Sequence, residues 1–467
     1  MTTFTMTIDG RAVAGHATFD VVDPATGEAF AEAPECDREQ LDAAMVSAQA
    51  AFRDWRDDLD RRRQVMHACA DALLARAEEL ARIATLEQGM PLSNARRGVQ
   101  RAADSFRRYA ALELPRTVVQ DDQEALVEVV RRPIGVIAAI KPWNVPIAMA
   151  VNTIAPAFRA GCSVVLKPSP FTPLATLKLG EILRGAAPAG TLNVVSGGND
   201  LGQWMTEHPT PRGVSFTGSV ATGKRVNVSA AADLKRVLLE LGGNDAAIVL
   251  DDMDPVDVAD RLYWRAFGNS GQICMAVKRL YVPESMYGAV VDALATKART
   301  TRVGNGLDAD TELGPVNNRP QFERIAGLVD GAVRAGAHVA AGGRALEGAG
   351  YFYEPTILSE AAEGMPIVDE EQFGPALPVL SYASVDDAVH RANDSTFGLG
   401  ASVWSADPDR AAALAERLEA GTVWINTHGM LGHAQPFAGT KWSGLGAENG
   451  IWSVHAFTEP QTIYHAR

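Results

Sequence analysis

The chain has 467 residues, with 43 Lys and Arg against 57 Asp and Glu, which gives a formal net charge of −14. A chain of this length exceeds what one hydrophobic core usually serves, so we expect two or more domains. The acidic balance, without a block rich in Lys or Arg, argues against a surface for nucleic acid or an anionic membrane.

The cysteines and the apolar stretches indicate the compartment. None of the four cysteines, Cys36, Cys69, Cys162 and Cys274, forms a C-x-x-C pair or a zinc-like cluster, so we expect free thiols and no metal site. Residues 1–10 have no basic region followed by an apolar core, and the apolar stretch 145–160 is interrupted by polar residues and proline. The sequence therefore predicts a cytoplasmic protein with no signal peptide and no membrane span.

The first elements along the chain are a turn and two helices. Residues 23–28, Asp-Pro-Ala-Thr-Gly-Glu, predict a turn between two short strands. Apolar residues from 41 to 55 recur at helical spacing, and a second helical pattern runs from about 62 to 87.

From Gly135 onward, short apolar runs alternate with helical patterns. Strands are predicted at 136–140, 163–166, 192–195, 214–216 and 237–239, with helices at 145–160, 172–184, 201–207 and 222–232. Such alternation predicts βαβ units and a parallel sheet, and continuous apolar strands fit burial on both faces. A second α/β stretch begins near Asp245, with strands at 246–250, 278–282 and 379–382. We therefore expect two closely packed α/β domains without internal repeats.

Two segments suggest catalytic side chains. Residues 268–274, Gly-Asn-Ser-Gly-Gln-Ile-Cys, form a glycine-rich turn that ends in Cys274. Such a turn can aim backbone N–H groups at an oxyanion beside a reactive thiol, although a small buried cysteine also fits. Glu240 follows an apolar strand and precedes two glycines, so it is a candidate general base with a raised pKa, or else a solvated loop acid.

Two further segments suggest binding groups. Asn144, in Pro-Trp-Asn after a strand, is a candidate oxyanion donor or an ordinary helix cap. Residues 216–224, Phe-Thr-Gly-Ser-Val-Ala-Thr-Gly-Lys, join a strand end to a helix N-terminus, where a pyrophosphate can bind. Their glycine spacing is not the usual dinucleotide pattern, so a plain strand-to-helix turn fits equally well.

Together these segments resemble the aldehyde dehydrogenase superfamily. The family's motifs occur in order as Pro-Trp-Asn at 142–144, Phe-Thr-Gly-Ser at 216–219, Glu-Leu-Gly-Gly at 240–243, Gly-Gln-Ile-Cys at 271–274 and Glu-Gln-Phe-Gly-Pro at 371–375. The resemblance extends from residues 23–27 to Phe437 and Ser443-Gly444. It implies an NAD(P)-dependent, non-acylating enzyme that oxidises an aldehyde to a carboxylic acid through a thioester.

The resemblance also implies roles for individual residues. Cys274 resembles the nucleophile, Glu240 the base that activates the deacylating water, and Asn144 the oxyanion donor that works with the Cys274 backbone N–H. The implied cofactor contacts are Trp143, Lys167, Ser169, Pro170, Gly218, Ser219, Gly223, Leu241, Glu371 and Phe373. The implied substrate pocket is Met149, Asn152, Ile273, Met275, Met430, Leu431 and Phe437. These pocket residues are mostly apolar, so we expect an uncharged aliphatic or aromatic aldehyde. His428 and His433 fall in the same loop, either behind the pocket or on the surface.

Two residues depart from the family pattern. Pro170 stands where many NAD-preferring relatives carry Glu. A carboxylate at that position would bond the ribose hydroxyls of NAD and repel the 2′-phosphate of NADP, and proline does neither. We therefore expect NAD as the usual cofactor, with NADP possible. Lys141 stands where relatives often have an apolar or small residue. Its ammonium group could be solvated or could contact the 2′-phosphate of NADP, and we favour the solvated state.

The resemblance implies an α/β fold in three parts. A doubly wound, parallel-sheet cofactor domain comprises residues 1–115 and 134–242, and a second α/β catalytic domain comprises 243–426. A small β oligomerisation ribbon combines 116–133 with 447–467, while 427–446 return to the cofactor domain. Residues 126–131 mix apolar and charged side chains, which predicts a half-exposed strand outside the main sheet. Family members form homodimers or homotetramers, so we expect one of these.

Two rival functions remain within this fold. A CoA-acylating relative uses the same cysteine but generally lacks the base, so Glu240 argues against it. A catalytically inactive structural relative is disfavoured by the presence of Cys274, Glu240 and Asn144 together.

Overall fold

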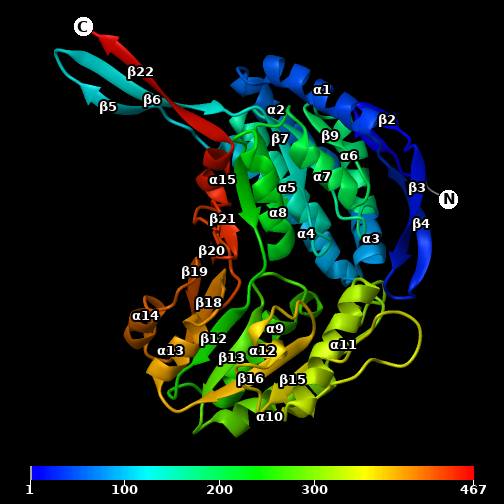
Figure 1. The fold of residues 1–467 in the computed structure, drawn as a ribbon, viewed down its shortest axis with the longest axis vertical. Coiled ribbons are helices and arrows are strands. Elements are labelled where there is room, and N and C mark those ends of the chain that lie inside the picture. The colour runs from blue at the N-terminus through cyan, green and yellow to red at the C-terminus, as the bar shows by residue number, and fades with distance from the viewer. Residues whose placement is uncertain (1–2) are drawn as a thin grey trace.

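The computed structural model describes residues 3–467, which fold into two α/β bodies with a β ribbon projecting from one of them (Figure 1). One body holds an eight-stranded sheet and the other a seven-stranded sheet. The chain crosses from the first to the second where β11 (Arg236–Glu240) ends and β12 (Asp245–Val249) begins. The predicted α/β class, with two sheets and a small ribbon, is confirmed.

The eight-stranded sheet has the order β2-β1-β9-β8-β7-β10-β11-β21. Its other strands are β1 (Met6–Ile8), β2 (Arg11–Val13), β7 (Val136–Ile140), β8 (Ser163–Lys167), β9 (Leu192–Val194), β10 (Gly213–Thr217) and β21 (Gly444–Leu445). Strands β9, β8, β7, β10 and β11 run parallel, with antiparallel strands at both edges. Every residue of β8 is buried, and because neighbouring strand residues point to opposite faces, both faces of the sheet are covered. The predicted parallel sheet is confirmed.

Helices pack on this sheet or on one another around it. They are α1 (Arg38–Trp55), α2 (Leu59–Ala75), α3 (Ala77–Gln88), α4 (Leu92–Ala111), α5 (Pro146–Ala160), α6 (Leu174–Arg184), α7 (Asn199–Glu207), α8 (Val220–Ala231) and α15 (Gly450–Ala456). Helices α5, α6, α7 and α8 each follow a parallel strand, as the alternating pattern predicts. Helix α8 needs glycine at one position, because a Cβ on Gly223 would overlap the Leu241 side chain.

The prediction of a single helix over 62–87 is wrong. The chain breaks at Arg76, whose φ of −121° and ψ of 26° end α2 before α3 begins. The Arg76 guanidinium pairs with Glu79 and with Glu181 of α6, and both α2 and α3 pack on α4 and on α6. No glycine or proline marks this break in the sequence. Helix α4 was not predicted at all.

The seven-stranded sheet has the order β14-β15-β16-β13-β12-β18-β19. Its remaining strands are β13 (Val277–Pro283), β14 (His338–Ala341), β15 (Thr356–Ser359), β16 (Ala376–Tyr382), β18 (Gly400–Trp404) and β19 (Thr422–Ile425). Its helices are α9 (Pro255–Phe267), α10 (Tyr287–Thr300), α11 (Arg319–Arg334), α12 (Pro366–Asp369), α13 (Val385–Asn393) and α14 (Pro408–Ala415). All strands are parallel to their neighbours except β14, which is antiparallel to β15.

Small antiparallel sheets complete the fold. In the projecting ribbon, β6 (Ala125–Pro133) lies between β5 (Thr117–Asp121) and β22 (Thr458–Ala466), and the C-terminus ends at its tip (Figure 1). Ala125, Val127 and Val130 of β6 are buried while other residues of the strand stay accessible, which confirms the predicted half-exposed strand. The predicted turn joins β3 (Ala17–Asp23) to β4 (Glu28–Glu35), and β17 (Phe397–Gly398) pairs with β20 (Thr440–Lys441).

The division into a cofactor domain, a catalytic domain and an oligomerisation ribbon at the residues given above stays a prediction. Helix α15 lies within 447–467 but packs on α5 of the first body, and β22 begins only at Thr458. Among the helices of residues 3–467, none has the combination of length and apolarity that a membrane crossing needs.

Candidate active site

The turn that carries Cys274 follows α9 and adopts an unusual backbone. Asn269, Ser270 and Gly271 have φ angles of 54°, 55° and 71°, the left-handed region that side chains disfavour. At Gly271 a Cβ would overlap the backbone of Gly374, so this position requires glycine. The turn leaves Cys274 partly exposed, whereas Cys36, Cys69 and Cys162 are buried. Cys274 is therefore the accessible thiol.

Buried polar groups hold this turn in place. The Lys278 ammonium donates to the carbonyl oxygens of Ile273 at 2.8 Å, Cys274 at 2.7 Å and Ala276 at 3.3 Å. The Gln272 side chain donates to the Asn269 and Pro315 carbonyls and accepts from the Asn317 N–H. Because these groups are buried, breaking any one bond would leave an unpaired polar atom.

Asn144 comes from the first body and meets this turn. Its side-chain N–H donates to the Gln272 carbonyl at 2.9 Å, and its own carbonyl accepts from the Asn269 side chain at 3.1 Å. An amide group carries two N–H donors, so the bond to Gln272 orients the group and leaves a second donor. The alternative of a helix cap is wrong, because Val145 occupies the N-cap of α5.

Glu240 lies at the end of β11, and its side chain is only 5% exposed. Its Oε1 is buried and has no hydrogen-bond partner among residues 3–467. Desolvation raises the pKa of Glu240 well above its usual value, the Glu448 carboxylate raises it further, and the Lys141 ammonium opposes both. The alternative of a solvated loop acid is wrong.

The expectation that the Lys141 cation is solvated is also wrong. Lys141 is 3% exposed, and its ammonium donates to the hydroxyls of Ser215 at 2.8 Å and Thr217 at 3.3 Å. The sequence places Lys141 at the end of β7, and β10 lies directly beside that strand in the sheet. The side chain therefore runs along the neighbouring strand, inside the protein.

The candidate cofactor residues gather at the carboxyl ends of β8 and β10, as expected for an open parallel sheet. Ser219 is the N-cap of α8 and accepts from the Thr222 N–H at 3.3 Å, so the positive end of this helix faces the sheet edge. Lys167 is 3% exposed, donates to the Pro168 carbonyl at 3.1 Å, and has a pKa lowered to about 8 by burial. Ser169 and Pro170 follow it and are partly exposed. A Cβ on Gly218 would lie 2.6 Å from the Phe216 ring, so glycine keeps this approach open.

Candidates from the two bodies meet beside the thiol. The rings of Trp143 and Phe373 pack edge to face, with centroids 5.2 Å apart. Glu371 accepts from the Gly243 N–H at 3.1 Å and lies 3.8 Å from the Lys278 ammonium. Burial raises the pKa of Glu371, and Lys278 opposes that effect. The motifs at 142–144, 240–243, 271–274 and 371–375 thus converge in space.

The candidate substrate residues differ in exposure. Phe437 is buried, Met149, Ile273, Met275 and Leu431 are partly buried, and Asn152 and Met430 are exposed. The Met430 thioether accepts a hydrogen bond from Arg265 of α9 at 3.4 Å. Arg265 is thus a basic side chain in contact with the candidate substrate residues, and the family motifs did not point to it.

The two histidines of the loop that contains Met430 and Leu431 differ in burial. His433 is exposed, whereas His428 is fully buried. The His428 ring nitrogens lie 2.9 Å from the Ser402 hydroxyl and 3.1 Å from the Met275 carbonyl, with the Asp245 carboxylate at 3.3 Å. His428 therefore supports the residue that follows Cys274.

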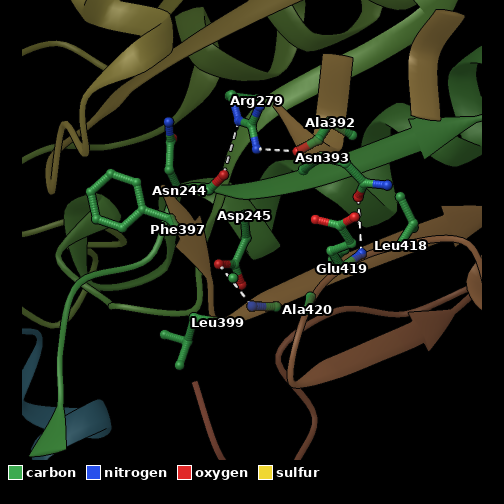
Figure 2. Close-up of a pocket in the computed structure, with 14 residues that line it drawn as sticks. Asn244, Asp245, Arg279, Ala392, Asn393, Phe397, Leu399, Leu418, Glu419 and Ala420 are labelled. Atoms are coloured by element: carbon green, nitrogen blue, oxygen red, sulfur yellow. Dashed lines mark hydrogen bonds between the residues drawn. The ribbon is translucent and has the colours of Figure 1, made fainter. Parts of the chain in front are cut away.

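A separate cavity of about 10 Å³ is lined by residues that include Asp245 and Arg279, which Figure 2 draws as sticks. Arg279 spans it, donating to the carbonyls of Asn244 and Ala392, while Asp245 accepts from the Gly400 N–H. A space of this size holds about one water molecule, so it is too small for a substrate.

Sequence comparisons agree with the geometry. Residues 12–463 match the model of the aldehyde dehydrogenase family. The chain is 39% identical to a mitochondrial aldehyde dehydrogenase of Leishmania tarentolae, over 97% of this chain and 93% of that protein. The chain belongs to the aldehyde dehydrogenase family. It is thus an oxidoreductase that acts on aldehydes.

Solved structures of relatives have the same fold. An aldehyde dehydrogenase from Bacillus cereus in complex with NAD⁺ superposes with a TM-score of 0.97 and 33% identity, over 100% of this chain and 97% of that chain. A betaine aldehyde dehydrogenase from Staphylococcus aureus in complex with NAD⁺ gives a TM-score of 0.95 and 32% identity, over 99% and 95% of the two chains. The expected family is therefore confirmed.

Although the residue Cys274 is partly exposed, the groups around its sulfur desolvate it, which makes the resting thiol a weak acid. Desolvation raises the pKa of Cys274 to about 12, Lys278 opposes it, and the carboxylates of Glu371, Glu240 and Asp245 add to it. The thiolate is the reactive form, and below the pKa its fraction grows tenfold with each pH unit.

We therefore predict that alkylation of the free enzyme by iodoacetamide accelerates about tenfold per pH unit between about pH 7 and 9, without levelling near the ordinary thiol pKa of about 8.5. The measurement is the rate of inactivation, with the adduct mapped by mass spectrometry. Cys274→Ala is the control. It should lose the adduct, because the other three thiols are buried, and it should lose turnover, because it lacks the expected nucleophile. A plateau below pH 9, or alkylation of Cys274→Ala at an equal rate, would contradict this.

Proposed function

We propose that this enzyme oxidises an aldehyde to its carboxylic acid through a thiohemiacetal and then a thioester on Cys274, with NAD as the usual cofactor. The bond from the Asn144 amide to the Gln272 carbonyl carries the proposal, because it puts a hydrogen-bond donor beside the turn of the thiol. The test is NADH formation, followed by absorbance, with a panel of simple aldehydes.

The residues at the sheet edge fit a dinucleotide. The α8 N-terminus capped by Ser219, with glycine at 218 and 223, offers N–H groups to a pyrophosphate. The buried Lys167 ammonium, which donates to the Pro168 carbonyl, would be a donor for the adenosine ribose. Glu371 would accept from the second ribose, and Phe373, whose ring packs edge to face with Trp143, would lie against the nicotinamide. Bound NAD supplies the hydride acceptor for the reacting carbon.

Acylation requires a thiolate and a stabilised oxyanion. Cys274 adds to the aldehyde carbon, and the second N–H of Asn144, together with the backbone N–H of Cys274, donates to the oxygen as it becomes negative. Lys278 keeps the Cys274 backbone in position through the neighbouring carbonyls. Loss of hydride from the carbon then leaves a thioester on Cys274.

Deacylation requires a base. Glu240 is buried near the thiol, and its unpaired Oε1 is suited to accept a hydrogen bond from a water that attacks the thioester. The water transfers a proton to Glu240, and the Cys274 thiolate leaves. This base disfavours the CoA-acylating alternative, in which CoA takes the acyl group. Adding CoA to the NADH assay should therefore give no acceleration.

Glu240→Gln should accumulate the thioester, because hydride transfer precedes the step that needs the base. We expect a pre-steady-state burst of NADH that survives while steady turnover falls by about 10²- to 10⁴-fold. Intact-mass spectrometry of the quenched enzyme measures the acyl adduct, and the same experiment on Cys274→Ala should show none. Normal turnover in Glu240→Gln, without an adduct, would assign the base elsewhere.

The substrate we propose is an uncharged, largely apolar aldehyde. Met149, Leu431 and Phe437 provide apolar surface, and the flexible Met430 at the exposed edge can adapt to several shapes. Asn152, Ile273 and Met275 complete the proposed pocket.

Accordingly, kcat/KM should be higher for hexanal and benzaldehyde than for succinic semialdehyde or betaine aldehyde. Charged substrates would have to lose water against an apolar wall, which costs free energy. A clear preference for succinic semialdehyde would contradict this and would point to Arg265 as the group that binds its carboxylate. In that case Arg265→Ala should remove the preference.

Cofactor selectivity should be moderate, because Pro170 supplies no carboxylate beside the adenosine ribose. A charge-assisted hydrogen bond is worth roughly 1.5–3 kcal/mol, so its absence lowers discrimination by about one to two decades. We expect Pro170→Glu to suppress turnover with NADP far more than turnover with NAD. The kcat/KM for both cofactors in both proteins measures this. An unchanged ratio would mean that position 170 does not face the ribose.

Assembly and location are also proposals. A homodimer or homotetramer is supported by the projecting ribbon, where Val118, Val119 and Tyr464 expose apolar surface. A cytoplasmic location is supported by the four free thiols.

A further inference from the structure

Two aromatic side chains join two of the candidate substrate residues. Trp424 lies on β19, the last strand of the seven-stranded sheet, and is 7% exposed, while His428 follows in the next loop and is fully buried. Their rings pack against each other with centroids 4.7 Å apart. The indole bonds to the backbone of Met430 and the imidazole to that of Met275, so this aromatic pair connects the two segments that carry these methionines.

Strand pairing determines the face of the sheet that the indole covers. Trp424 is the register partner of Ser402 on β18, so both side chains point to the same face. Gly400 lies two residues before Ser402 and therefore on that face as well. A Cβ on Gly400 would overlap the Asp245 carboxylate and lie 2.6 Å from the Trp424 ring, so glycine leaves room for both groups.

Hydrogen bonds favour one tautomer of the imidazole. The Ser402 hydroxyl accepts from the Trp404 indole at 2.9 Å and lies 2.9 Å from His428 Nδ1, so it can donate its own proton to that nitrogen. This network assigns the ring hydrogen to Nε2, which donates to the Met275 carbonyl oxygen at 3.1 Å. The Asp245 carboxylate, 3.3 Å from Nε2, favours the same assignment.

The indole holds Met430 by its single polar hydrogen. The Trp424 N–H donates to the Met430 carbonyl oxygen at 2.8 Å. Gly429 has a φ of 68°, so the backbone turns directly before Met430 in a conformation that favours glycine. A Cβ on Gly429 would lie 3.6 Å from the Met275 carbonyl oxygen, so the two segments are adjacent at this point. The aromatic pair therefore fixes the Met430 backbone relative to Met275.

We propose that Trp424 is a positioning residue for substrate selection, which holds Met430 in place as the outer wall of the pocket, against the tail of a medium-length aldehyde. His428 ties the aromatic pair to Met275, the residue after the nucleophile. The space between the reacting carbon and the outer wall is therefore set by two side chains that need not touch the substrate. The inference rests on the proposed function, in which Met275 and Met430 belong to an apolar pocket.

The length of the aldehyde decides whether its tail meets the outer wall. Met430 is 53% exposed, at the open edge of the proposed pocket, so a long chain such as hexanal extends toward it and a short chain such as propanal does not. Each methylene group that packs on apolar surface strengthens binding roughly fourfold. A wall that moves loses part of this gain, because water then replaces some of its contacts with the tail. Hexanal should therefore depend on the Trp424 bond much more than propanal does.

The experiment compares kcat/KM for hexanal and propanal in Trp424→Phe. Phenylalanine keeps an aromatic ring against His428 and removes the N–H that holds Met430. We expect the preference for hexanal over propanal to fall by roughly two- to tenfold, the effect of one lost hydrogen bond. The loss should appear in KM for hexanal rather than in kcat, because the proposed catalytic groups are unaltered.

A double-mutant cycle shows whether the indole acts through Met430. Met430→Ala removes the side chain that forms the outer wall and should itself lower the preference for hexanal. If Trp424 acts by positioning that side chain, Trp424→Phe in the Met430→Ala background should cause no further loss of preference. A second loss that adds to the first would overturn the inference, since the indole would then act by another route.

Variants of His428 separate the inner anchor from the outer wall. His428→Leu removes the donor to the Met275 carbonyl and should lower kcat/KM for propanal and hexanal alike, whereas a loss confined to hexanal would contradict the role given to His428. His428→Gln, whose amide can donate in place of Nε2, should recover part of the activity. Trp204→Phe is the matched control, because it removes an indole that lies on α7 of the other body, 4.5 Å from the Arg38 guanidinium. It should leave the ratio for the two aldehydes unchanged.

The outcomes distinguish this inference from the proposed function. An equal loss for both aldehydes in Trp424→Phe, or an unchanged ratio, would overturn the role of Trp424 and leave the thioester mechanism intact. If Trp424→Phe does not fold, an unchanged ratio in Met430→Ala overturns that role. If the wild-type enzyme reduces NAD with neither aldehyde, the proposed function fails as well.

Discussion

The Lys278 ammonium is the group on which the geometry around Cys274 depends. It is buried and donates to three carbonyl oxygens of the segment 273–276, directly after a turn with three consecutive positive φ angles. Left-handed conformations of the non-glycine residues Asn269 and Ser270 cost of order 1–3 kcal/mol each, so they persist only where surrounding contacts compensate for them. The bonds of Asn269 to the Asn144 carbonyl and of Ser270 to the Gly314 carbonyl supply such contacts. The Lys278 cation holds the segment that follows and also lowers the pKa of the thiol.

The same ammonium links the two bodies of the enzyme. It lies 3.8 Å from Glu371, which accepts from the N–H of Gly243, in the connection from β11 to β12. A Cβ on Gly242 would overlap the Glu371 carboxylate, so glycine lets this connection approach the acid. One set of contacts therefore joins Glu371, the turn that carries Cys274 and the connection that follows Glu240.

Sequence patterns predicted the features that lie within one contiguous segment of the chain. They did not predict which charged side chains the fold buries. The strand–helix alternation after Gly135 and the motifs around Cys274, Glu240 and Asn144 were readable because each occupies a contiguous segment. The break at Arg76 was not, since no glycine or proline marks it in the sequence. Glu448 was missed and the Lys141 cation was expected in water, because burial of a lone charged residue arises from neighbouring strands and leaves no local pattern.

The two proposed catalytic groups influence one another. Desolvation is the main cause of the raised pKa of Cys274, and the Glu240 carboxylate adds to it. Because the electrostatic effect between two groups is reciprocal, a thiolate on Cys274 would oppose ionisation of Glu240. In the proposed mechanism the thioester carries no charge on sulfur, so that opposition is absent at the step for which Glu240 is the proposed base.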